Sequence, residues 1–99
     1  MVIKFVCDAV LWFDKVNGNT YHSCRITRTG DGKVICAPFQ YGYGSAYKES
    51  ALVEMIKAKW IPKKYNTRNM YLYDRENKYP VLWNSSTGTK KECIANGTK

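Results

Sequence analysis

The chain has 99 residues and a formal net charge of +8, with 44% hydrophobic and 14% aromatic residues. This composition predicts one folded domain, 1–99, and excludes an intrinsically disordered chain. No apolar run approaches the roughly 18 residues of a membrane-spanning helix, so we expect no membrane association. Lys4 and Asp8 interrupt the apolar N-terminus and no small-residue cleavage site follows, so we expect no signal peptide and a cytoplasmic location.

Residues 1–41 predict an antiparallel three-stranded meander. Residues 2–14 alternate between apolar and mixed positions, as a half-buried strand does. Asn17-Gly18 is a strong hairpin signal, and residues 20–28 and 33–41 have the composition of the next two strands. Pro38 places the third strand at an edge, because proline has no N–H to donate to a neighbouring strand. We expect His22 at the rim of this sheet.

Residues 46–61 predict the one clear helix. Its apolar stripe, spaced at the helical period, consists of Leu52, Met55, Ile56 and Trp60. Ser45 has a side chain suited to an N-cap, and Pro62 ends the helix because it cannot donate a backbone hydrogen bond. The stripe is expected to pack on the meander.

The last third predicts a second hairpin over 69–83, because apolar runs flank the polar Arg75–Lys78 segment. Residues 90–99 are expected to form a frayed basic tail. The predicted fold class is therefore α+β: a three-stranded antiparallel sheet, one packed helix in the order β-β-β-α, and a C-terminal β-hairpin.

Catalytic and metal-binding patterns are absent from the sequence. The four cysteines, Cys7, Cys24, Cys36 and Cys93, form no C-x-x-C pair, and His22 is the only histidine. We expect four unpaired thiols and no metal. No pair of acids suggests acid–base chemistry, so we expect a protein that is not an enzyme, with no cofactor and no small-molecule ligand.

The positive charge is concentrated in the second half of the chain. Residues 1–50 hold six cations and four acids, a net +2, whereas residues 51–99 hold ten cations and four acids, a net +6. The segment 57–68 contains no acid, and Trp60 and Tyr65 lie among its cations. This mixture suits phosphate contacts with stacking, and it also suits a solubilising surface.

The segment Tyr41-Gly42-Tyr43-Gly44-Ser45 precedes the predicted helix. Its two glycines and the free N–H groups of a helix start could seat an anion. The same segment also fits a tight strand-to-helix turn whose tyrosines cover the edge of the core. A single G-x-G pattern leaves both interpretations open.

The stretches Gly18-Asn19-Thr20-Tyr21-His22-Ser23 and Tyr41-Gly42-Tyr43-Gly44-x-x-Tyr47 resemble small proteins of phages and prophages. The resemblance covers about residues 12–60 and implies an inhibitor of host defence of the anti-CRISPR kind, with a host protein or nucleoprotein complex as partner. The β-β-β-α order is also similar to the DNA-binding domains of plant AP2 proteins and the arm-binding domains of integrases. That second similarity is an analogy of fold alone.

Two functions are therefore predicted in competition. The first is a basic protein that binds and blocks a host protein or nucleoprotein. The second is a direct nucleic-acid binder that uses the basic segment 57–68 and the outer sheet face. The expected binding residues for both are Tyr21, Arg25, Arg28, Tyr41, Tyr43, Tyr47, Lys48, Lys57, Lys59, Lys63, Lys64 and Arg68.

Overall fold

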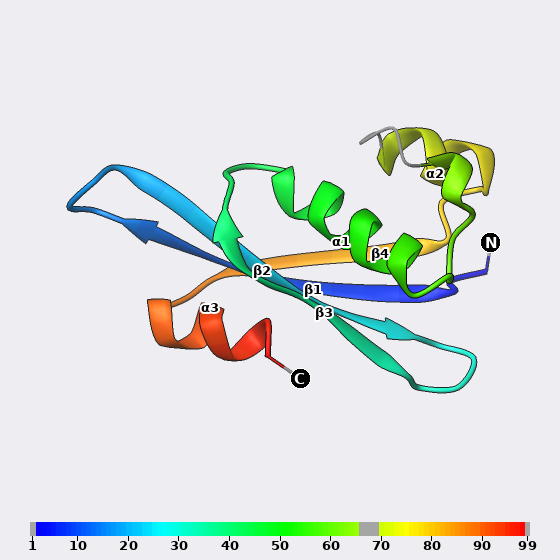
Figure 1. Ribbon diagram of the computed structural model, residues 1–99, viewed down its shortest axis with the longest axis horizontal. Helices are drawn as coiled ribbons and strands as arrows, with labels where there is room; N and C mark the ends of the chain where they lie inside the picture. Colours follow the sequence, from blue (N-terminus) through cyan, green and yellow to red (C-terminus); the bar gives the residue numbers. More distant parts are fainter. Residues whose placement is uncertain (1, 66–69, 99) are drawn as a thin grey trace.

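The computed structural model describes residues 2–65 and 70–98, and within these ranges it shows a mixed four-stranded sheet with helices on both faces (Figure 1). The sheet has the order β3-β2-β1-β4. In chain order the elements are β1 (Phe5–Asp14), β2 (Asn19–Arg28), β3 (Val34–Tyr41), α1 (Ala46–Lys57), the 3₁₀ helix η1 (Lys63–Tyr65), α2 (Met70–Glu76), β4 (Val81–Thr87) and α3 (Lys90–Asn96). None of the described helices is long and apolar enough to cross a membrane.

The strands β1, β2 and β3 pair antiparallel in chain order. The Asp14 carboxylate holds the first turn by accepting from the backbone N–H groups of Val16 and Asn17, at 3.0 and 3.3 Å. On the third strand, Pro38 and Phe39 together lie opposite Ser23, which makes a β-bulge. This bulge lies on the edge strand, where a missing N–H costs least.

The predicted antiparallel sheet with a C-terminal hairpin over 69–83 is wrong. In the structure β4 pairs parallel with β1 from Phe5↔Val81 to Leu11↔Thr87, on the side of β1 away from β2. The first half of the predicted hairpin is the helix α2, whose buried residues Met70, Tyr73 and Asp74 have the spacing i, i+3, i+4. So short an apolar pattern fits the two-residue period of a strand as well as the period of a helix. The pattern of this segment therefore led to the wrong prediction of a strand.

The basic tail expected at 90–99 forms the helix α3 where the structure describes it. Thr89 and Glu92 make a capping box, in which each side chain accepts from the backbone N–H of the other. The helix lies on the face of the sheet opposite α1 (Figure 1). There the Ser23 hydroxyl donates to the Cys93 carbonyl, and the Asn96 amide donates to the Asp8 carbonyl at 3.1 Å.

The main core lies between α1 and the other face of the sheet. Leu52 and Met55, from the predicted stripe of α1, are fully buried, while Ile56 and Trp60 are half-buried at its margin. The strands contribute Phe5, Cys7, Ala9, Cys24 and Ile26 to this core. Small side chains at the centre of the sheet let α1 approach closely.

Asp74 ties α2 to β4. It is buried, and one of its carboxylate oxygens accepts from the indole N–H of Trp83 at 3.0 Å. No described residue donates to the other oxygen. Burial raises the pKa of the Asp74 carboxyl, and the Trp83 hydrogen bond offsets part of that rise.

The packing of α3 can be tested at Gly97. A Cβ placed there would lie 2.8 Å from the Ala37 carbonyl oxygen and 2.8 Å from the Ser23 Cβ, whereas a Cβ at Gly30 would meet nothing within 4 Å. Gly97→Ala should therefore lower the free energy of unfolding by about 1–3 kcal/mol in chemical denaturation. Gly30→Ala should change it by no more than about 0.5 kcal/mol. Equal effects of the two changes would mean that α3 does not pack on the sheet.

The buried Asp74 predicts a pH dependence with a definite sign. Because its folded pKa is raised above the ordinary 3.8, the folded state binds the proton more tightly than the unfolded chain does. Wild-type stability, measured relative to Asp74→Asn, should therefore increase as the pH falls through the raised pKa, and level off below about 3.8. Denaturation curves of both proteins between neutral and acid pH give this difference. A difference that stays constant with pH would contradict the burial of an ionisable Asp74.

Candidate partner-binding site

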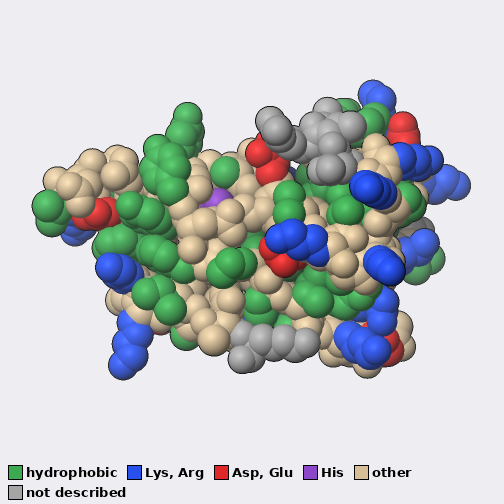
Figure 2. Space-filling model, viewed as in Figure 1, with side chains coloured by type: hydrophobic (Ala, Val, Ile, Leu, Met, Phe, Trp, Pro, Cys, Tyr) green, Lys and Arg blue, Asp and Glu red, His purple; other side chains and the backbone are tan. Residues whose placement is uncertain are grey.

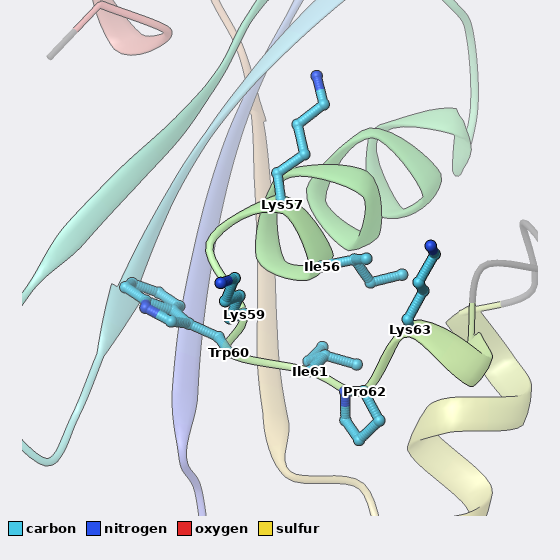
Figure 3. Close-up of a pocket in the computed structure, with 7 residues that line it drawn as sticks. All are labelled: Ile56, Lys57, Lys59, Trp60, Ile61, Pro62 and Lys63. Atoms are coloured by element: carbon cyan, nitrogen blue, oxygen red, sulfur yellow. The ribbon is translucent and has the colours of Figure 1, made fainter.

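A pocket of about 640 Å³ lies just beyond the C-terminal end of α1, and we call it the lysine pocket. It is lined by Ile56, Lys57, Lys59, Trp60, Ile61, Pro62 and Lys63. Figure 3 shows Lys59 and Lys63 on opposite sides of Ile61 and Pro62, while Lys57 points away from the hollow. The pocket thus combines an apolar floor with two ammonium groups on its rim.

Two backbone hydrogen bonds at the end of α1 place Lys59 at this rim. The Trp60 N–H donates to the Met55 carbonyl at 2.9 Å, and the Lys59 N–H donates to the Ile56 carbonyl at 3.0 Å. These two bonds form a Schellman motif, whose turning residue takes a left-handed conformation and is usually glycine. Here Lys59 occupies that position with φ +63°. A side chain in this conformation costs about 1 kcal/mol relative to glycine.

Trp60 is held in place from within the protein. Phe5 stacks on it with ring centroids 5.8 Å apart, and the Arg28 guanidinium lies 4.6 Å from its ring centroid. Arg28 is fixed in turn by two hydrogen bonds to the Asp31 carboxylate, at 3.0 and 2.6 Å. Those bonds hold the pKa of Asp31 down at about 2 and raise that of Arg28. Trp60, one of the residues that line the pocket, is therefore held by contacts within the protein.

The lysines that line the pocket are largely uncompensated by acids. Lys57 lies 3.7 Å from the Glu54 carboxylate, and its side chain is 70% exposed. Neither Lys59 nor Lys63 has an ion-pair partner among residues 2–65 and 70–98. Figure 2 shows Lys and Arg side chains gathered mainly over the half of this face that carries the end of α1 and α2. The pocket thus opens on a positively charged surface.

A second group of predicted residues lies at the opposite end of the sheet, on the face that carries α3. Tyr21 packs against both Trp12 and Phe39, at centroid distances of 5.6 and 5.0 Å, and Tyr41 meets it edge-on at 5.8 Å. The Trp12 and Phe39 rings also lie 6.2 Å apart, so the three rings form one aromatic cluster on this face. Tyr43 is 71% exposed in the following loop.

The other predicted binding residues are used within the protein or lie elsewhere. Tyr47, predicted as a binding residue, is buried in the core. The Arg25 guanidinium donates to the Thr98 carbonyl at 2.9 Å. Lys48 lies 5.4 Å from the Trp83 ring, and Lys64 lies 5.1 Å from the Tyr65 ring. Arg68 lies outside the described residues. The predicted set therefore does not form a single site.

His22 is buried at 1% exposure rather than placed at the sheet rim, so that prediction is wrong. Its Nδ1–H donates to the Gly42 carbonyl at 3.1 Å, and its Nε2 lies 2.7 Å from the Ser50 hydroxyl. A Cβ at Gly42 would lie 2.7 Å from the imidazole ring, so this glycine is required by close approach. Ser45 occupies the N-cap position of α1 but makes no side-chain capping bond. The loop thus turns the chain over a buried histidine.

The Ser50–His22 pair has the arrangement of a nucleophile beside a base. Ser50 opens into a hollow of about 240 Å³ lined also by Gln40, Glu49, Val53 and Glu54. The two carboxylates would repel the negative charge that develops in acyl transfer. We therefore interpret the pair as a structural bond between β2 and α1. Sequence reasoning missed it because the two residues lie on separate elements.

The strained Lys59 gives a direct test of the geometry of the pocket rim. Lys59→Gly removes a Cβ from a left-handed position and should raise the free energy of unfolding by up to about 1 kcal/mol. Lys57→Gly, at the last residue of α1, should instead lower it, by up to about 1 kcal/mol, because glycine is a poor helix former. Thermal or denaturant unfolding measures both. Destabilisation by Lys59→Gly would contradict the left-handed backbone.

The cation-rich rim, the apolar floor and the strained lysine belong to one continuous stretch, Ile56–Lys63. No protein-family model, no curated protein and no solved structure matches this chain.

Proposed function

We propose that this chain is a non-catalytic binding protein whose lysine pocket docks on an acidic protein surface. The observation that carries the proposal is Lys59, which keeps a left-handed conformation at the rim of the pocket although glycine would be less strained. Strained backbone of this kind tends to occur at functional sites. The expected ligand is a carboxylate-rich patch with a projecting apolar side chain, which would fill the floor while its acids meet Lys59 and Lys63.

Two features favour a protein partner over nucleic acid. Phe5 and Arg28 already occupy ring surface of Trp60 on which a base would otherwise stack. The outer sheet face, which the alternative prediction places against nucleic acid, is covered at its centre by α3, and Ser23 there is 0% exposed. A protein that recognises base edges directly needs several free hydrogen-bonding side chains on such a face.

The proposal takes the partner to be a host protein or nucleoprotein complex that binding would block, as the resemblance to phage proteins implies. An anti-defence role and a cytoplasmic location are part of the same proposal. Charged rims of this type act mainly by speeding association, while an apolar centre slows dissociation. The pocket has both components within one short segment.

The proposal can be tested with two double variants of equal net charge. Lys59→Glu/Lys63→Glu changes the rim, and Lys15→Glu/Lys91→Glu changes exposed lysines on the β1–β2 turn and on α3. Each protein is immobilised and exposed to a bacterial lysate with and without nuclease treatment, and retained proteins are quantified by mass spectrometry. We expect wild type and the Lys15/Lys91 variant to retain the same proteins. The rim variant should lose them by about tenfold or more.

Titration of labelled duplex, single-stranded DNA and RNA completes the experiment. We expect binding no tighter than the non-specific range, roughly 10⁻⁴–10⁻⁶ M at physiological salt. Complete release of the partners by nuclease, or tight sequence-selective binding that resists salt, would overturn the proposal in favour of direct nucleic-acid binding. Equal losses in both double variants would show that net charge alone, and not the pocket, is responsible.

A further inference from the structure

The strand β4 forms one edge of the sheet, and its hydrogen bonds show which backbone groups face outward. The Phe5 N–H donates to the Pro80 carbonyl at 3.2 Å, and the Gly88 N–H donates to the Leu11 carbonyl at 2.9 Å. In a parallel ladder the residues that bond to the neighbouring strand alternate. Even-numbered residues of β4 therefore bond to β1. The N–H and C=O groups of Val81, Trp83, Ser85 and Thr87 face away from it.

This edge lacks the devices that usually protect an exposed strand. Natural edges carry proline, lysine or a bulge. The opposite edge, β3, has both Pro38 and a bulge. β4 is VLWNSST, with an unbroken register and no charged residue. Among the described residues, none makes a backbone hydrogen bond to its outward-facing groups.

The surroundings of the edge indicate what could pair with it. On the α1 side, the Lys48 ammonium lies 5.4 Å from the Trp83 ring centroid. On the α3 side, Leu82 is 47% exposed. A second copy would bring another net charge of +8 against this one, whereas an acidic strand would be attracted. An added strand with acids on one face and aliphatic side chains on the other would match both sides.

We propose that the open edge of β4 accepts an extended acidic segment of a partner protein as a fifth strand. Trp83, Ser85 and Thr87 supply the backbone hydrogen bonds, Lys48 meets the acids, and Leu82 contacts the aliphatic side chains. Main-chain bonds give such a complex its affinity, and alternate side chains give it specificity. This surface does not include the lysine pocket, and the proposal stands without it.

The probe is a short capped peptide of alternating valine and glutamate, titrated at neutral pH into isotope-labelled protein and followed by NMR. Saturable shifts are expected at the amides of Trp83, Ser85 and Thr87, with slower hydrogen exchange at the same amides. The amides of Asn84 and Ser86, which already bond to β1, should exchange slowly with or without peptide. A valine–lysine peptide of equal length should bind about tenfold more weakly or not at all. No shifts at the three outward amides would overturn the proposal.

Ser85→Pro removes an outward N–H without removing a bond to β1, so it should abolish peptide binding while the β1 amides keep their positions. Ser85→Ala is the control, because it loses only the hydroxyl that bonds Tyr47. Thr87→Pro gives the same test at the end of the strand if Ser85→Pro does not fold. Unchanged peptide binding in a folded proline variant would overturn the proposal. Self-association of wild type that disappears in the proline variant would also overturn it, because the edge would then pair with a second copy.

Discussion

The pairing of β1 along both of its edges is the constraint on which the rest of the structure depends. Cys7 and Ala9 are buried under α1, while on the other face the backbone carbonyls of Asp8 and Val10 accept hydrogen bonds from Asn96 and Cys93 of α3. A strand paired on both edges and contacted from both faces lies inside the sheet. The placement of β4, α1 and α3 follows, because each covers a side of β1 that the meander leaves open.

Part of this arrangement could be predicted from the sequence, and each element that could not be predicted has its own physical reason. The stripe of α1 and the Asn17-Gly18 turn are local signals, and the structure has a helix and a hairpin there. The start of β4, Val81–Trp83, lies within the predicted second strand of the 69–83 hairpin. The rest, Asn84–Thr87, is polar, and its strand conformation depends on the ladder offered by β1. The α3 helix did carry a readable signal, the capping box of Thr89 and Glu92, although only Cys93 is buried in it.

The candidate site, too, could be predicted only in part from the sequence. The sequence indicated that cations gather over 57–68, and the structure places Lys59 and Lys63 around a pocket. It could not show the positive φ of Lys59, since glycine is the usual residue there. The support of Trp60 by Arg28 joins residues far apart in the chain, which no local pattern reveals. Because Phe5 pairs with Val81 and also stacks on Trp60, the pocket and the open edge of β4 begin close together.

The parallel pairing of β1 with β4 has a consequence for synthesis on the ribosome. The meander and α1 leave the exit tunnel first, yet β1 gains its second neighbour only when Val81–Thr87 emerges, and its outer face is covered only by Lys90–Asn96. Until then the nascent chain exposes an unpaired strand edge and uncovered apolar side chains, which favour aggregation. Such distant contacts also form slowly. The emergence of β4 and α3 therefore decides when this edge and these side chains are covered.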